Sequence, residues 1–140
     1  LLQGEWALNL RHGYGSMKYR SGNSFEGFWE SDQKSGSGVM VWRDKDELYT
    51  GQWAADLPDG FGEHVWGESS ARTKKESCNI YRGHFVKGRR EGQGTFFFMN
   101  GSQYTGEWAN DMKQGEGLFL YADGRIYGGL FHENRMTQEE

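Results

Sequence analysis

The chain has 140 residues and a formal net charge of −4, and its apolar content of 35% includes many aromatic residues (16%) beside 22 glycines. This acidic balance gives no overall electrostatic reason to bind nucleic acid or an anionic membrane. Cys78 is the single cysteine. A chain that cannot form an internal disulfide and is poor in aliphatic core residues favours a reducing, intracellular compartment over secretion.

One pattern recurs from end to end with a period of 23 residues. Its copies begin near residues 2, 25, 49, 81, 104 and 127, and one polar insert at 67–80 lengthens the third step. Counted from the first residue of each copy, position 3 is glycine and position 5 is Trp or Phe in all six copies. Positions 12 and 14 are glycine, and position 18 is aromatic, in the five complete copies. A unit that recurs in this way indicates a repeat architecture, whereas a binding loop usually occurs once.

Each copy is predicted to form a β-hairpin. Positions 1, 3 and 5, and again 14, 16 and 18, alternate with polar residues, which is typical of strands with one buried face. Polar turns such as "NDMKQ" separate the two strands, and "SG", "NG" or "DG" at 21–22, 100–101 and 123–124 join one copy to the next, where glycine can adopt positive φ. Residue size suggests a register with position 5 opposite 14, 3 opposite 16 and 1 opposite 18, so that each ring faces a glycine. To keep the rings of successive copies on one face of the sheet, the connection between copies must then have three residues.

In chain order, the five complete hairpins run over about 2–19, 25–42, 49–66, 81–98 and 104–121, and a truncated copy starts at Tyr127. The expected fold is all-β: one elongated, single-layer antiparallel sheet of about eleven strands, forming one repeat array over 1–140. The insert is expected to protrude as a mobile loop, as either a specific contact or tolerated length. Because the chain begins and ends within a copy, we expect it to be part of a longer polypeptide.

The pattern Y-x-G-x-W, then Gly-x-Gly, then an aromatic residue at 23-residue spacing closely resembles the MORN (membrane occupation and recognition nexus) repeat. Within that family, "DKDELYTGQW", "FGEHVWG" and the long insert before "YRGHFVKGRREGQG" resemble the radial spoke head 10 homologue group of motile cilia. Departures from the pattern are Leu2 for the first aromatic residue, Lys45 at a turn glycine, and the insert. The resemblance implies a non-enzymatic scaffold without cofactors, which binds other axonemal subunits in the cytoskeleton of a cilium or flagellum.

No residue pattern in the sequence points to catalysis or to a metal. The Gly-x-Gly pairs lack the Lys-Ser/Thr sequel and the strand-to-helix context of a nucleotide loop, and they occur five times. The four histidines, His12, His64, His84 and His132, lie in different copies without metal-ligand spacing. The acidic residues belong to polar turns and form no catalytic pair. Function is therefore expected on a surface and not in a pocket.

The face opposite the rings carries apolar residues that a single-layer sheet leaves uncovered. We predict that the C-terminal half of this face docks a protein partner, such as a helix. Packing against a flanking segment of the longer polypeptide is the alternative. The predicted partner-binding residues are Phe28, Val39, Val41, Phe97, Met99, Leu118, Leu120 and Leu130.

Two basic clusters are weaker candidates for contact with an anionic ligand. One lies in the insert and the other in the "KGRRE" turn, so the two leave the sheet along opposite edges and cannot form one compact site. The candidates are Lys74, Lys75, Arg89 and Arg90. Two alternatives to the scaffold therefore stay open: a peripheral membrane or phosphoinositide-binding module, and the regulatory region of a larger enzyme.

Overall fold

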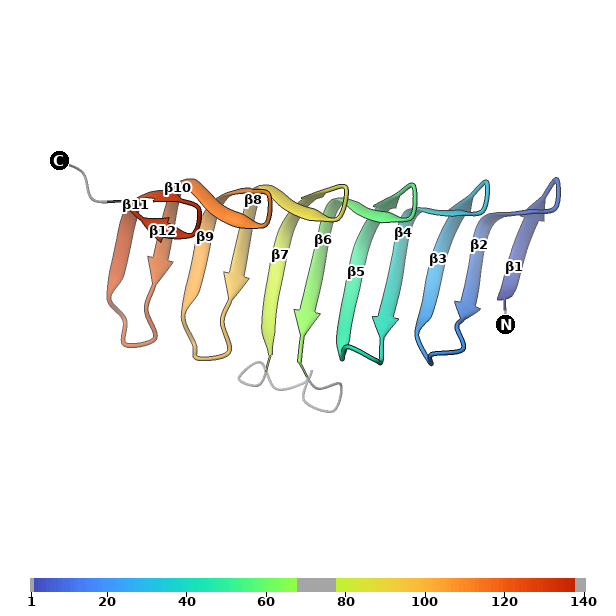
Figure 1. The fold of residues 1–140 in the computed structure, drawn as a ribbon, viewed down its shortest axis with the longest axis horizontal. Helices are drawn as coiled ribbons and strands as arrows, with labels where there is room; N and C mark the ends of the chain where they lie inside the picture. Colours follow the sequence, from blue (N-terminus) through green and yellow to red (C-terminus); the bar gives the residue numbers. More distant parts are fainter. Residues whose placement is uncertain (1, 68–77, 138–140) are drawn as a thin grey trace.

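The computed structural model describes residues 2–67 and 78–137, which form one open antiparallel sheet in which strands adjacent in sequence are adjacent in space (Figure 1). The predicted all-β, single-layer fold is confirmed, with twelve strands because the sixth copy adds a short last one. In the described part of the chain, no helix has the length and apolarity needed to cross a membrane. The strands are β1 (Leu2–Ala7), β2 (Leu10–Lys18), β3 (Ser24–Glu30), β4 (Gln33–Trp42), β5 (Glu47–Ala54), β6 (Leu57–Trp66), β7 (Asn79–Val86), β8 (Arg89–Phe97), β9 (Gln103–Ala109), β10 (Met112–Leu120), β11 (Ile126–His132) and β12 (Arg135–Met136).

The turn inside each hairpin has only two residues. Between β9 and β10, Asn110 and Asp111 have φ of 50° and 69°, as a type I′ turn requires. The predicted turn "NDMKQ" is therefore too long, because strand β10 already begins at Met112. The second turn residue also ties neighbouring copies together. Asp111 N–H donates to the Arg90 carbonyl at 3.2 Å, and its carboxylate accepts from Arg90 N–H at 2.9 Å.

The joins between copies contain the glycines that the sequence predicts at positive φ. Gly22, Gly101 and Gly124 have φ of 92°, 93° and 94°. The connections are longer than the three residues expected, because Lys18 pairs with Ser24 and five residues lie between them. The segment 68–77, which contains most of the insert, lies outside the described residues. Asn79 and Ile80, at its predicted end, already belong to β7.

The predicted register is wrong by two residues. Gly27 pairs with Gly38 within its hairpin, and Gly38 pairs with Gly51 across the join, so position 3 faces 14. A bulge on the second strand of each complete hairpin produces this shift, and position 12 lies within it at a positive φ, as Gly36 does at 84°. One glycine from each of the first eleven strands thus forms a row across the sheet: Gly4, Gly15, Gly27, Gly38, Gly51, Gly62, Gly83, Gly94, Gly106, Gly117 and Gly129.

The rings cover this glycine row, as predicted, but not by facing it directly. A Cβ on Gly117 would lie 2.4 Å from the Tyr104 ring, and Tyr104 is fully buried. The position-5 indole reaches sideways onto the preceding copy, where Trp108 Nε1 donates to the Gly94 carbonyl at 3.1 Å. Edge-to-face contacts then join the rings, for example Tyr104 with Trp108 at 5.2 Å. Glycine is required here because the ring occupies the space of a Cβ.

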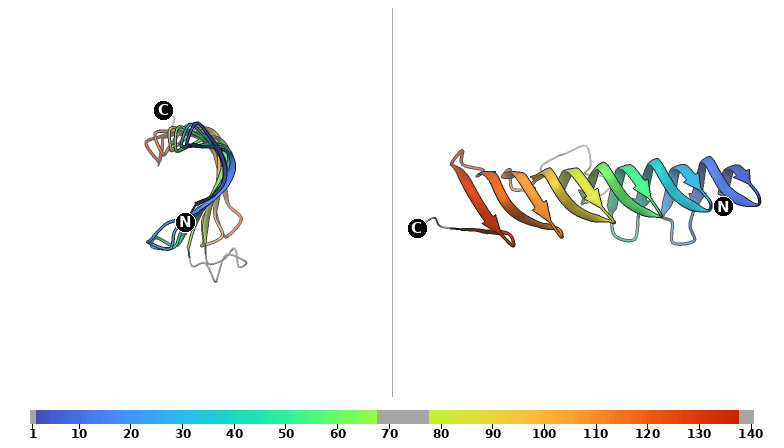
Figure 2. Two further views of the ribbon diagram at one scale, coloured as in Figure 1. Left: turned by 90° about the vertical axis from the view of Figure 1, so that its right-hand side faces the viewer. Right: turned by 90° about the horizontal axis from the view of Figure 1, so that it is seen from above.

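The sheet curves so that the rings lie inside the curve. Lys34 is the second residue of β4, near the hairpin turn, yet its Nζ lies 5.8 Å from the ring of Tyr19, which follows the opposite end of β2, two strands away. Arg90 lies 5.6 Å from the Trp66 ring in the same way. A flat strand of this length would separate the two ends by roughly 20 Å or more. The ring-bearing face is therefore concave, in agreement with the arc seen end-on in Figure 2, and the opposite face is convex.

Candidate interaction surface

Seven of the eight predicted partner-binding residues lie on strands of the convex face. Met99 is the exception, because it belongs to the connection after β8 and not to a strand; it is 55% exposed there. The seven do not form one continuous exposed surface. They divide into two exposed ends with a packed centre between them.

The packed centre is a row of apolar side chains on β5 to β8. Leu48 pairs with Val65, Val65 with Ile80, and Ile80 with Phe97. Val65 and Ile80 are only 6% exposed and pack together with buried Cys78. Sequence reasoning missed Leu48, Val65 and Ile80. Val65 occupies position 17, like Val41, Phe97 and Leu120, so the repeat numbering alone could have found it.

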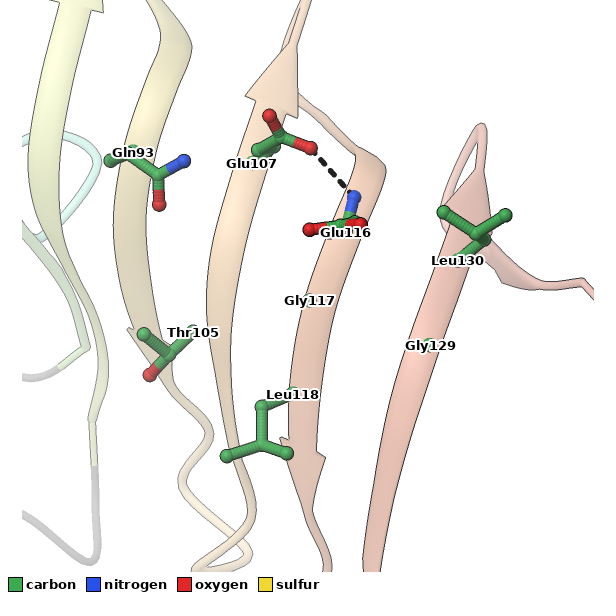
Figure 3. A pocket seen from close by; sticks show the side chains of 8 residues that line it. All are labelled: Gln93, Thr105, Glu107, Glu116, Gly117, Leu118, Gly129 and Leu130. Carbon is green, nitrogen blue, oxygen red and sulfur yellow. Dashed lines mark hydrogen bonds between the residues drawn. The ribbon is translucent and has the colours of Figure 1, made fainter.

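The C-terminal end of the convex face is open, and we define the C-terminal patch as Leu118, Leu120, Ile126 and Leu130. Ile126 is 63% exposed, Leu118 49% and Leu130 41%. Between Leu118 and Leu130 lies a shallow hollow of about 600 Å³, whose lining includes Gly117 and Gly129 (Figure 3). The apolar side chains thus border a concavity on a rigid sheet.

The rim of this hollow is polar and acidic. Gln93, Thr105, Glu107 and Glu116 complete its lining. The Glu107 carboxylate accepts from the Glu116 N–H at 2.6 Å, which fixes Glu107 against the bulge and leaves the Glu116 side chain exposed (Figure 3). An occupant would therefore need apolar side chains for the leucines and donors for the rim.

The N-terminal end of the convex face is a smaller surface. Phe28 is 47% exposed and packs edge-to-face on Tyr14, with 5.5 Å between ring centroids. Val39 and Val41 line a hollow of about 310 Å³. Hydrogen bonding to Glu26 raises the pKa of Tyr14, so this phenol stays a neutral donor. The smaller hollow makes this end the weaker docking candidate.

The basic candidates do not converge on a site. Lys74 and Lys75 lie outside the described residues. Arg90 points into the concave face, where Nε contacts the Asp111 carboxylate at 3.2 Å and its guanidinium lies 5.0 Å from the Trp108 ring. Arg89 donates to the Asn110 side chain at 3.2 Å. The guanidinium of Arg90 is thus engaged by contacts within the sheet, and the geometry gives no support to a lipid headgroup site in this turn.

The concave face also holds a partly buried histidine, His64. Its ring stacks between Trp42 and Trp66, at 5.6 and 4.0 Å, and its Nε2 lies 2.8 Å from the Glu47 carboxylate. Burial lowers the pKa of His64, against the hydrogen bond to Glu47, which raises it. Position 16 holds Met or Phe in the other complete copies, so His64 fills a packing position.

Comparison with known proteins agrees with this geometry. The family model of the MORN repeat matches residues 3–24, 25–47, 49–70, 81–103 and 104–124. MORN repeat-containing protein 3 of Xenopus laevis is 33% identical over 89 residues, which cover 64% of this chain and 35% of that protein. The matched part thus spans about a third of the length of that curated relative.

Proposed function

Because this chain belongs to the MORN-repeat family, we propose that it is a protein-binding scaffold that captures its partners on the C-terminal patch. The MORN repeat is generally an interaction module without catalytic activity of its own. The observation that carries the proposal is the exposure of Leu118 and Leu130, which line a preformed hollow, together with that of Ile126 on the same patch. A rigid sheet that exposes grouped apolar side chains is suited to bind a partner with little ordering cost.

An amphipathic helix is the partner element that fits this patch best. Strands β9 to β11 lie side by side at about 4.8 Å, and a helix advances about 5.4 Å per turn. A helix lying across the strands therefore presents about one turn to each strand. Its apolar stripe would cover the leucines, and its flanking basic side chains would meet Glu116 and the other polar groups of the rim.

We place this scaffold in the axoneme of motile cilia or flagella, with other axonemal proteins, such as radial spoke subunits, as partners. The support for this location is the layout of the third and fourth copies, which resembles the radial spoke head 10 homologue group. The acidic net charge of −4 and the engagement of Arg90 within the fold favour a protein partner over an anionic membrane.

Proximity labelling in motile ciliated cells tests both parts of the proposal. The wild-type chain is expected to label axonemal proteins, and Leu118→Glu should lose a defined subset of them. Leu57→Glu is the matched control, since Leu57 is 45% exposed but begins β6, away from the patch. Labelling confined to other compartments would contradict the axonemal location. Equal loss in both variants, or salt-sensitive sedimentation of the wild type with phosphoinositide vesicles, would contradict capture by the patch.

A further inference from the structure

A basic side chain at position 10 recurs on the concave face and meets an acid from the following copy. The acid is at position 8, the second residue of the hairpin turn. The three pairs, with their nitrogen–oxygen distances, are Arg11–Asp32 (2.8 Å), Lys34–Asp56 (3.8 Å) and Arg90–Asp111 (3.2 Å). In the third copy, position 10 is Pro58, and position 8 of the next copy is then Gly88. In these four copies, an acid is therefore present only where there is a cation for it to pair with.

The fifth copy departs from this pattern. Its position-10 cation is Lys113, but position 8 of the sixth copy is Asn134. The Asn134 side-chain oxygen accepts from the Lys113 backbone N–H at 2.9 Å, as the Asp111 carboxylate does from Arg90, so the link between copies is kept and only the negative charge is lost. Within residues 2–67 and 78–137, Lys113 Nζ makes no hydrogen bond and no ion pair. The absence of a counter-charge thus results from the identity of Asn134.

The surroundings of the Lys113 ammonium hold its charge but do not neutralise it. Nζ lies 5.5 Å from the centroid of the Phe98 ring, 5.7 Å from that of Tyr104 and 6.0 Å from that of Trp108. The face of a ring attracts a cation but carries no net charge. Burial lowers the pKa of Lys113, and the positive charge of Arg90 lowers it further. A partly buried cation in this position gains from a negative partner.

The side from which an acid meets a position-10 cation is open to solvent. In the three complete pairs, the acidic side chains are 40–49% exposed, whereas the basic side chains are only 14–22% exposed. In the part of the chain that the structure describes, no second layer covers the concave face (Figure 2). A carboxylate of another molecule can therefore reach Lys113 without displacing an acid of this chain.

We propose that Lys113 binds a carboxylate of a partner protein, an aspartate or glutamate side chain that takes the place of the position-8 acid. A carboxylate is favoured over other anions because the same cation position binds a carboxylate in three other copies. The rings of Phe98 and Tyr104 beside the ammonium favour apolar residues next to that acid. The site lies on the concave face, so it does not depend on capture of a helix by the C-terminal patch on the convex face.

NMR titration with a pair of capped peptides tests the site. The probe is Leu-Gly-Glu-Gly-Leu, whose leucines flank the acid on one face of an extended chain, and the control peptide has Gln in place of Glu. The Cε resonance of Lys113 is expected to shift on binding, with a dissociation constant roughly five- to tenfold lower for the Glu peptide, as for a partly screened ionic contact. Lys34, which is already paired with Asp56, should not respond. Equal binding of the two peptides, or an equal shift at Lys34, would overturn the proposal.

Exchange of the acid between two copies gives a reciprocal test. Asn134→Asp supplies Lys113 with an acid of its own and should abolish the preference for the Glu peptide. Asp56→Asn removes the acid from Lys34 and should create a second site, seen as a shift of the Lys34 resonance. Both replacements keep the oxygen that accepts the backbone N–H of the cation, so both variants should fold, which thermal melting checks. A preference that persists in Asn134→Asp, or no response of Lys34 in Asp56→Asn, would show that the missing acid does not make the site.

Other sources of negative charge are separated by the same resonance. Inorganic phosphate and phosphatidylserine vesicles are titrated in place of the peptide, at the same concentration of negative charge. Both are expected to perturb the Lys113 resonance less than the Glu peptide does. An equal response to phosphate would make the site a nonspecific contact for anions, and a larger response to vesicles would assign it to a membrane surface. Either result would overturn the proposal of a protein carboxylate.

Discussion

The concave and convex faces of the sheet differ in how far their apolar side chains are buried. On the concave face, Tyr49, Tyr81 and Tyr104 are completely buried although no second layer covers them, because each ring lies on the glycine row and inside the curve of the strands. On the convex face of β10 and β11, Leu118 and Leu130 remain 41–49% exposed. Stability should therefore depend mainly on the concave face, and partner binding mainly on the convex one.

Removal of a concave ring should give the largest effect. Trp108 is 4% exposed, and its indole donates to Gly94, so Trp108→Ala is expected to lower the free energy of unfolding by about 3–5 kcal/mol. Leu130→Ala, on the convex face, should change it by less than about 0.5 kcal/mol. Urea denaturation measures both values. Similar losses of unfolding free energy in the two variants would contradict the conclusion that stability depends mainly on the concave face.

A methyl group in the glycine row should give the next effect. A Cβ on Gly62 would lie 2.2 Å from Tyr49 Oη and 2.5 Å from its Cζ, so Gly62→Ala is expected to destabilise by roughly 1–3 kcal/mol, as overpacking does. Gly128→Ala is the matched control, because its Cβ would meet only the flexible Leu118 side chain, at 3.3 Å. Thermal melting of the two variants compares them, and equal melting temperatures would refute the requirement for glycine.

Acidification should weaken the concave face through His64. Its folded pKa is lowered by burial, so the unfolded chain binds the proton first, near its usual pKa of about 6.5. The contribution of neutral His64 is complete above that pH and declines as the pH falls below it, by up to about 1.4 kcal/mol per unit of pKa difference. Denaturation between pH 7.5 and 5 measures this decline. His64→Phe, which reproduces Phe96 and Phe119 of other copies, should flatten the dependence of stability on pH. An unchanged slope in this variant would show that other groups cause the pH dependence.

A small effect is also expected from an ion pair on the convex face. Arg82 Nε contacts the Glu63 carboxylate, and their side chains are 44% and 35% exposed. Solvent screens such a pair, so Arg82→Gln should cost less than about 1 kcal/mol, and less still in high salt. A loss as large as that of Gly62→Ala would show that the convex face also determines stability.

The sequence predicted more of the fold than of the candidate site. Alternation places residues on one face or the other, and it assigned seven of the eight predicted site residues to the convex face correctly. It could not show that Val65 and Ile80 are buried on that face. Where a strand is apolar on both faces, the pattern does not distinguish buried from exposed positions. Alternation also placed Met99 on the convex face, because the sequence pattern does not show that strand β8 already ends at Phe97.

The sequence by itself determined the period of 23 residues, the hairpins, the single-layer sheet and the pairing of rings with glycines. Only the tertiary structure decided the register, because a shift of two residues preserves the alternation of faces and both registers therefore bury the same side chains. The bulge at position 12 selects Gly27 opposite Gly38. The curvature is also a tertiary feature, seen where Lys34 and Arg90 reach rings at the far ends of β2 and β6, each two strands away.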